Sequence, residues 1–193
     1  MKMLSNRFTL WENGSMRTRN IPLLGGLLSM AAGIAASTTP LQTVERVDLN
    51  RYVGRWYEIA RYPNRFERNC DRDVTAEYSI REDGKIRVLN SCVTAAGKKK
   101  QADGTAIVVD KETNAKLKVT FFWPFYGKYW IIDLGHDYEY AVVGEPSRGY
   151  LWILSRSPDL PETTYQEILG RLSEQGYLPS KLVRTRQTAA APH

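Results

Sequence analysis

Cysteine and histidine are the first residue types to consider, because they could supply a nucleophile, a metal ligand or a disulfide. The chain of 193 residues has two cysteines, Cys70 and Cys92, and two histidines, His136 and His193. Neither histidine lies near a cysteine in the sequence, so Cys–His catalysis or a metal site has little to be built from. We therefore expect no metal site and no cofactor.

The two cysteines are instead expected to pair with each other. Glu82-Asp83-Gly84 is typical of a hairpin turn, which would place Val74 roughly opposite Cys92, with Cys70 one short loop away. An even number of cysteines in an exported protein also favours a disulfide. Two free thiols are the first alternative, and a catalytic thiol is the second.

Export is expected from the N-terminal residues. Arg17 and Arg19 precede an uncharged stretch, residues 21–36, that is rich in Leu, Ala and Gly, and small residues at 35–37 suit a cleavage site. Residues 1–37 are therefore predicted to direct the chain to the periplasm or out of the cell. Retention of the segment as a membrane anchor is the alternative.

Two further features bear on this segment. Met16 directly precedes the basic pair, so residues 1–15 would be an over-extended start if translation begins there. No cysteine precedes Cys70, so we expect no lipid-modified N-terminal cysteine. Association with a membrane surface by other means stays open.

The net charge of +6 does not indicate nucleic-acid binding. Four basic residues and one acidic residue fall within residues 1–37, so the remaining chain carries only +3. The dense basic run Lys98-Lys99-Lys100 is expected in a turn, where a solvated loop is favoured over a polyanion-binding patch.

The sequence predicts that short β-strands form most of the domain and position the side chains of any functional site. Eight strand-like segments follow at regular spacing, separated by Gly, Pro, Asp and Asn. They are Trp56–Arg61, Val74–Ile80, Ile86–Val93, Gly104–Asp110, Lys116–Phe122, Tyr129–Leu134, Glu139–Gly144 and Tyr150–Arg156. Tight turns and the lack of long crossover helices indicate an antiparallel up-and-down meander. One helical turn is expected before them, at residues 47–52.

A helix is predicted after the last strand, over residues 161–175. It carries one apolar stripe, formed by Tyr165, Ile168, Leu169 and Leu172. We expect this stripe to pack on the outside of a barrel, against Trp130 or Ile153. Binding of a partner protein is the alternative.

Several motifs, in order, resemble one family. The run Gly54-Arg55-Trp56-Tyr57-Glu58-Ile59-Ala60-Arg61 resembles the first-strand motif of the lipocalins, in particular the bacterial group related to apolipoprotein D and plant temperature-induced lipocalins. Residues 64–67 are similar to the loop that follows, residues 121–129 to an aromatic segment, and residues 138–154 to a later strand pair. The resemblance covers about residues 44–186.

This resemblance implies an all-β fold: an eight-stranded antiparallel up-and-down barrel with one C-terminal α-helix packed outside. Residues 38–187 would form this domain, and residues 188–193 a disordered tail. The resemblance further implies that Trp56, following Gly54, closes one end of the barrel, with Arg156 packed over its indole. These three residues would be structural.

Function is expected in the barrel interior, which can hold one small ligand. Alternation along the strands predicts that the lining comprises Ala60, Tyr78, Val88, Asn90, Phe121, Tyr129 and Trp152. Such aromatic and aliphatic side chains suit an acyl chain, so the expected ligand is a fatty acid or a lysophospholipid. Arg61 and Arg65 are expected at the open end, where a positive charge would favour an anionic head group.

The resemblance implies non-catalytic binding and transport of such ligands in the cell envelope, with a role in membrane-lipid maintenance under stress. A monomer or a homodimer is expected. One alternative is an enzyme on the same fold that uses a strand cysteine as its nucleophile. A third hypothesis, haem or tetrapyrrole binding, would depend on His136.

Overall fold

The computed structural model describes residues 39–188. The predicted targeting segment, 1–37, and residues 189–193 of the predicted tail lie outside this range. Within residues 39–188, no helix combines the length and the apolar character needed to cross a bilayer.

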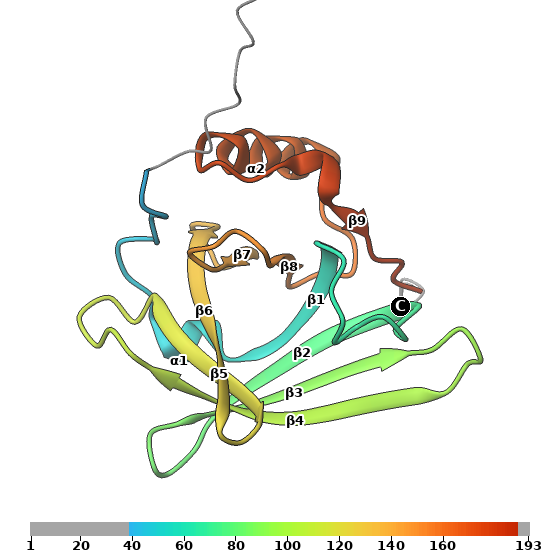
Figure 1. The fold of residues 1–193 in the computed structure, drawn as a ribbon. Helices are drawn as coiled ribbons and strands as arrows, with labels where there is room; N and C mark the ends of the chain where they lie inside the picture. Colours follow the sequence, from blue (N-terminus) through green and yellow to red (C-terminus); the bar gives the residue numbers. More distant parts are fainter. Residues whose placement is uncertain (1–38, 189–193) are drawn as a thin grey trace, which may run out of the picture. The chain divides into compact units, whose positions relative to one another are not determined.

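The described strands form one antiparallel sheet that closes on itself (Figure 1). Their order is β2-β3-β4-β5-β6-β7-β8-β1-β9, and a further pairing of β1 with β2 closes the barrel. The bounds are β1 Gly54–Arg61, β2 Arg72–Ile80, β3 Ile86–Val93, β4 Lys99–Val108, β5 Lys116–Phe122, β6 Phe125–Leu134, β7 Tyr140–Gly144, β8 Leu151–Ser155 and β9 Val183–Arg184. The predicted eight-stranded antiparallel barrel is therefore confirmed, and the short β9 is added to it.

One strand differs from its prediction in a way that changes the local surface. β4 begins at Lys99 instead of Gly104, because its first residues pair with the end of β3, as Val93 does with Lys99. The turn before it spans only residues 94–98. The prediction that Lys99 and Lys100 lie in a turn is therefore wrong. Figure 1 shows β3 and β4 extending beyond most of the other strands.

The helices lie where the sequence predicts them. α1 (Leu49–Tyr52) is capped by Asp48, whose carboxylate accepts a hydrogen bond from the Asn50 backbone N–H at 2.9 Å. α2 (Glu162–Glu174) lies over β7 and β8 in Figure 1. A short 3₁₀ helix, η1 (Pro179–Lys181), follows it.

Two hydrophobic clusters explain why some strands are apolar on both faces. In β8, Leu154 and Trp152 face an inner cluster inside the barrel, while Leu151 and Ile153 face an outer cluster beneath α2. The outer cluster includes the helix residues Tyr165, Ile168 and Leu172, with Leu169 and Trp130 partly buried against it. The predicted packing of the helix stripe on the outside of the barrel is confirmed.

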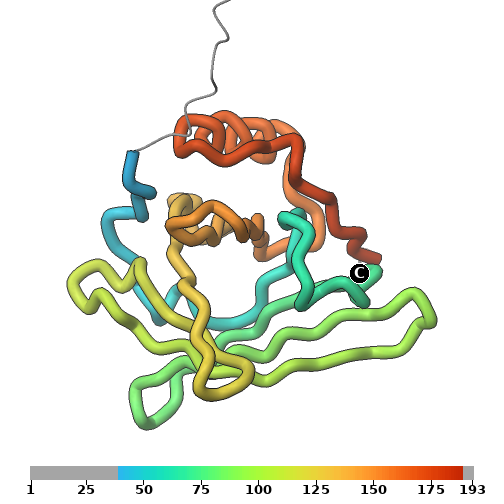
Figure 2. Tube along the Cα trace, viewed as in Figure 1, coloured from blue at the N-terminus to red at the C-terminus, as the bar shows by residue number. Residues whose placement is uncertain are grey.

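The C-terminal segment, residues 183–188, completes the barrel wall. β1 pairs with β2 only through residues 54–57. Beyond them, β9 pairs with the end of β1, and Gln187 Nε2 donates hydrogen bonds to the carbonyl oxygens of Glu58 (2.8 Å) and Val74 (2.9 Å). Figure 2 shows this red segment beside the green start of β2. The segment therefore bridges a seam between the two strands.

Candidate functional site

One end of the barrel is filled by the Trp56 indole. This side chain is 0% exposed, and its Nε1 donates a hydrogen bond to the Tyr52 carbonyl oxygen at 2.8 Å. The Arg156 guanidinium lies 3.8 Å from the centroid of the indole and donates to the Arg55 carbonyl oxygen at 2.9 Å. Gly54 adopts a φ of +94°, which L side chains rarely adopt. The geometry suits a closing role for these residues.

Three tyrosines lie next to this closed end and cross the interior. The Tyr129 hydroxyl is 2.7 Å from the Tyr52 hydroxyl and 3.0 Å from the Tyr78 hydroxyl. Burial raises the pKa of Tyr78 to about 12, and it raises the pKa values of Tyr52 and Tyr129 well above the ordinary value. The three hydroxyls therefore remain neutral and pair with one another, so Tyr78 and Tyr129 form a floor for the remaining interior.

Above this floor, the structure brings together four more of the predicted lining residues. Val88 is buried in the inner cluster and Trp152 is partly buried against it. Asn90 occupies the same face of β3 as Val88. The Phe121 ring lies over Gly104, where an added Cβ would come within 2.7 Å of it. Phe121 is nonetheless 43% exposed, so it lies at the rim and not deep in the barrel.

Ala60 does not face the interior, so its predicted place in the lining is wrong. A β-bulge in β1 changes the register with β8: Glu58 pairs with Leu154, but Ala60 pairs with Ile153. Ile153 belongs to the outer cluster beneath α2, and Ala60 is buried in that same cluster. Strict alternation counted from Trp56 misses the extra residue that a bulge inserts.

The bulge also turns Arg61 toward the open end of the interior, where it meets two carboxylates. Its Nη1 donates to Glu58 Oε1 at 2.7 Å, and its Nε lies 3.3 Å from Glu67 Oε2. Trp152 Nε1 donates to Glu67 Oε1 at 2.8 Å, and the Thr185 hydroxyl donates to Glu58. We call these five side chains the rim network.

The rim network pairs the positive charge that was predicted at the open end with carboxylates. Arg61 lies there, but Glu58 and Glu67 already balance its charge. Arg65 is exposed and lies over the ring of Phe66, with 5.1 Å between guanidinium and ring centroid. Sequence reasoning missed the two glutamates, although both belong to the motifs around Arg61 and their spacing could have suggested ion pairs.

Glu58 is the most buried charged group of the network, at 2% exposure. Burial, with the neighbouring Glu67 carboxylate as a second cause, raises the pKa of Glu58 well above its ordinary value. The folded protein then binds this proton more tightly than the unfolded chain does. The resulting stabilisation is complete below the unfolded-state pKa and is lost as the pH rises through the folded-state pKa.

Replacing Glu58 with glutamine should remove this pH dependence. The free energy of unfolding of the wild type, relative to Glu58→Gln, is expected to fall as the pH rises above about 4.3, by at most about 1.4 kcal/mol per pH unit. Urea unfolding at a series of pH values measures the difference. Glu82→Gln, at an exposed turn position, is the control. A difference independent of pH would show that Glu58 binds its proton equally in both states.

The sequence model of the lipocalin-like domain family matches residues 47–187. This chain is a lipocalin. Among curated proteins it is 40% identical to temperature-induced lipocalin-1 of Arabidopsis thaliana over 160 residues, covering 79% of this chain and 86% of that protein. It is also 40% identical to outer membrane lipoprotein Blc of Escherichia coli strain K12 over 174 residues, covering 88% and 98%. Apolipoprotein D of Macaca fascicularis is 37% identical over 177 residues, covering 85% and 91%.

Solved structures agree on the fold of this lipocalin. Insecticyanin of Manduca sexta superposes with a TM-score of 0.64 at 25% identity, covering 79% of this chain and 87% of that one. Apocrustacyanin C2 superposes with a TM-score of 0.61 at 19% identity, covering 75% and 82%. The latter similarity shows the fold alone.

The two cysteines of this lipocalin form the predicted disulfide, Cys70–Cys92. Their Cα atoms are 5.6 Å apart, and the bond ties the loop after β1 to the open end of β3. The chain has only these two cysteines. An enzyme that uses a cysteine thiol, the alternative considered above, would therefore have no free thiol while the disulfide is formed.

His136 lies outside the interior of the lipocalin barrel. It occupies the turn between β6 and β7, and its side chain is 98% exposed. Among residues 39–188, no group of three or more His, Cys, Asp or Glu side chains is arranged to hold a metal ion. His136 is therefore not positioned to bind a haem inside the barrel.

Proposed function

We propose that this lipocalin binds a single-chain lipid, a fatty acid or a lysophospholipid, inside the barrel and carries it without chemical change. The observation that supports this most is the inner face itself, which is apolar and aromatic, with Trp56 completely buried at one end. Each buried methylene contributes about 0.8 kcal/mol. An acyl chain can therefore reach micromolar affinity after the loss of translational and conformational entropy. Membership of the lipocalin family supports the binding of a hydrophobic ligand.

The polar groups near the open end favour one kind of head group. Asn90 Oδ1 is buried and has no hydrogen-bond partner among the residues that the structure describes. A buried acceptor of this kind is stabilised by a donor. The Arg61 charge, in contrast, is already balanced within the rim network. We therefore favour a lysophospholipid with amino or hydroxyl donors over a ligand that ends in a bare carboxylate.

Export and a place in the cell envelope belong to the same proposal. The Escherichia coli relative is an outer membrane lipoprotein by name, and the disulfide of this chain suits an oxidising compartment. We propose a periplasmic or secreted carrier that maintains membrane lipids under stress. Either a monomer or a homodimer could perform this role, because each barrel has its own interior.

A bulky side chain placed in the interior tests whether the ligand lies there. Val119 is a partly buried inner-face residue of β5, and Ile107 is a partly buried outer-face residue of the neighbouring β4. Val119→Trp should weaken binding of oleoyl lysophosphatidylethanolamine by about tenfold or more, because the indole would occupy the space of the acyl chain. Displacement of a fluorescent fatty acid measures the affinity.

Ile107→Trp is the matched control, and it should bind the lipid as the wild type does. If both variants bind like the wild type, the ligand is not inside the barrel. Oleic acid serves as the second ligand. If it binds more tightly than the lysophospholipid, the preference for a donor-bearing head group is wrong, although the barrel site itself stands.

A further inference from the structure

The connection between β5 and β6 exposes large apolar side chains that the barrel does not use. Phe122 is 75% exposed, Trp123 77% and Phe125 72%. The two phenyl rings are stacked on each other, with 6.4 Å between their centroids. We call these three residues the aromatic tip. Large exposed aromatic clusters mark sites of interaction, whereas single exposed apolar residues do not.

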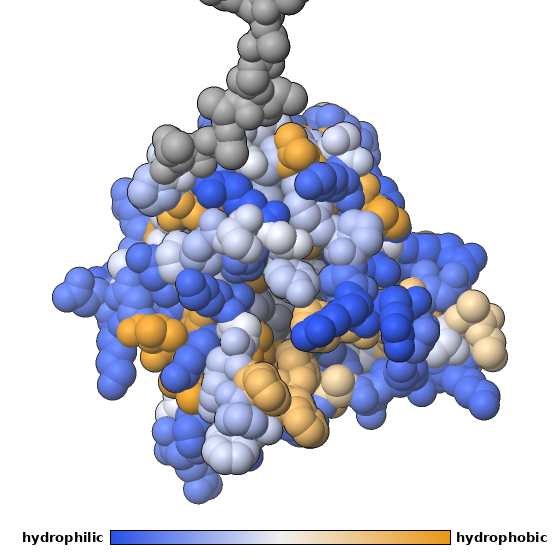
Figure 3. Space-filling view, in the orientation of Figure 1, coloured by the Kyte–Doolittle hydropathy of each residue, from blue (hydrophilic) through white to orange (hydrophobic). Residues whose placement is uncertain are grey.

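A basic surface lies beside the aromatic tip on the outside of the sheet. Lys118 of β5 pairs with Lys128 of β6, and both are exposed on the face opposite to the inner residue Val119. The same outer face continues across β4 to β3 through the pairing of Thr105 with Arg87. We define the basic face as Arg81, Arg87, Lys116, Lys118 and Lys128. Figure 3 shows an orange patch amid mostly blue surface, where Figure 1 draws the β5–β6 hairpin.

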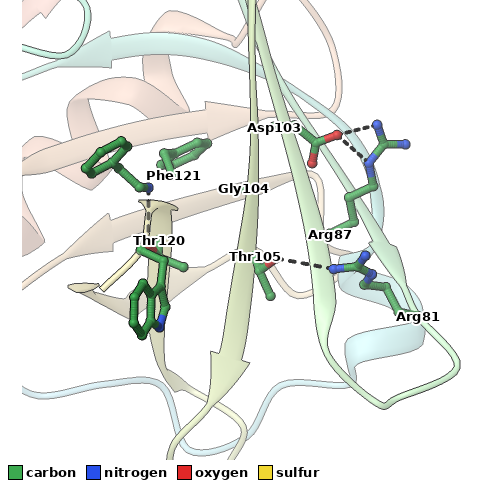
Figure 4. A pocket seen from close by; sticks show the side chains of 9 residues that line it. Arg81, Arg87, Asp103, Gly104, Thr105, Thr120 and Phe121 are labelled. Atoms are coloured by element: carbon green, nitrogen blue, oxygen red, sulfur yellow. Dashed lines mark hydrogen bonds and ion pairs between the residues drawn. The ribbon is translucent and has the colours of Figure 1, made fainter. Parts of the chain in front are cut away.

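A surface hollow of about 390 Å³ joins the tip to the basic face, at the point where the pairing of β4 with β5 ends (Figure 4). Its lining includes Phe122 and Trp123 of the tip together with Arg81 and Arg87 of the basic face. Arg81 Nη1 donates to Thr105 Oγ1 at 3.3 Å. Arg87 pairs with Asp103 at 2.5 Å, and Asp103 also lines the hollow, so the charge of Arg87 is balanced there. Each guanidinium has five N–H donors, so donors remain for a phosphate group.

We propose that the aromatic tip and the basic face dock this lipocalin onto a bilayer that contains anionic phospholipid. Aromatic side chains favour the membrane–water interface, and Lys and Arg next to them attract anionic head groups. The hollow would receive one lipid phosphate between the guanidinium groups and the tip. A second copy of the chain fits less well, because a symmetric contact through this surface would bring two basic faces together.

Docking would also place the open end of the barrel near the lipid. The β5–β6 connection lies at the open end, as do the β3–β4 turn and the start of β8. A lipid leaving the bilayer would therefore have a short path to the interior. Only this consequence rests on the proposed lipid carriage, because docking itself depends on surface residues outside the ligand site.

Vesicle co-sedimentation of the full chain tests the proposal. The vesicles are phosphatidylcholine alone, or phosphatidylcholine with about one-third phosphatidylglycerol. The wild type should partition onto the anionic vesicles, and the triple variant Phe122→Ser/Trp123→Ser/Phe125→Ser should do so about tenfold less or weaker still. Leu178→Ser is the control, because Leu178 is 51% exposed but lies after α2. This control should sediment as the wild type does.

The charged part of the surface is tested separately. Lys118→Glu/Lys128→Glu should reduce partition onto anionic vesicles and leave partition onto neutral vesicles unchanged, and added salt should have a similar effect on the wild type. Wild-type tryptophan fluorescence should be quenched by brominated phosphatidylcholine in the anionic vesicles. Trp123→Phe should lose most of this quenching while still sedimenting. The quenching measurement stands even if the triple variant folds poorly.

Three outcomes would overturn the docking proposal: equal sedimentation of wild type and triple variant, quenching that does not depend on Trp123, or self-association through the tip without vesicle binding. Displacement of the fluorescent fatty acid is measured on the same variants. A triple variant that keeps this interior binding but loses vesicle binding supports docking independently of the ligand. A wild type that docks but binds no fatty acid or lysophospholipid would refute the proposed function alone.

Discussion

Trp56→Ala is expected to lower the free energy of unfolding by about 3–5 kcal/mol, as is usual for removal of a large buried aromatic ring. The indole is completely buried and donates a hydrogen bond to the Tyr52 carbonyl oxygen. Its loss would leave a cavity at the closed end and would remove the ring on which the Arg156 guanidinium rests. Urea unfolding followed by circular dichroism measures the change.

Trp123→Ala is the matched control for this substitution. The same side chain is removed, but from a position that is 77% exposed, so the free energy of unfolding should change by no more than about 0.5 kcal/mol. Trp56→Phe should lower the free energy of unfolding by an amount between those for Trp56→Ala and Trp123→Ala, because it keeps a ring beneath Arg156 but loses the indole N–H. If Trp56→Ala lowered the free energy of unfolding as little as Trp123→Ala does, the stability of the closed end would not depend on the indole.

Cys70→Ser/Cys92→Ser is expected to lower the free energy of unfolding by about 3 kcal/mol. The disulfide closes a loop across a sequence separation of 22 residues, and most of its effect comes from restricting the unfolded chain. Urea unfolding of the oxidised wild type and of the double variant gives the difference. The wild type unfolded in the presence of a reductant is the control, and the urea concentration at its unfolding midpoint should match that of the double variant.

The double variant also bears on function. It has no thiol, yet it should still bind oleoyl lysophosphatidylethanolamine in conditions where it is folded, because neither cysteine belongs to the proposed lining. A variant as stable as the oxidised wild type would contradict the stabilising role. A variant that is folded but cannot bind lipid would show that the bond shapes the open end.

Much of the barrel could be predicted because its strands carry local signals. β5 alternates apolar and polar residues from Lys116 to Phe122, and the structure has the same bounds. β3 likewise has its predicted bounds, after a turn in which Gly84 adopts a φ of +74°. A turn that needs glycine and a strand that needs one apolar face each depend on a few neighbouring residues. The position of Tyr78 and Val88 inside the barrel follows from the same signals.

The parts that could not be predicted depend on residues far apart in the sequence. The bulge near Ala60 is visible only against the register of β8. Glu67 meets Trp152 across 85 positions, so this contact of the rim network has no local signature, unlike the ion pairs of Arg61 with Glu58 and Glu67. β9 has two residues and no alternation to detect. In each case a long-range contact decides the structure, and a pattern counted along one strand carries no information about it.

The C-terminal segment that bridges β1 and β2 determines when the barrel can be finished. Gln187 bonds the Glu58 carbonyl oxygen across 129 positions. A chain still being synthesised has both neighbouring strands but lacks the residues that join them, so two strand edges remain unpaired. Contacts this distant in sequence also form slowly. The barrel wall is therefore sealed only once residues 183–188 have been synthesised and have folded back onto β1 and β2.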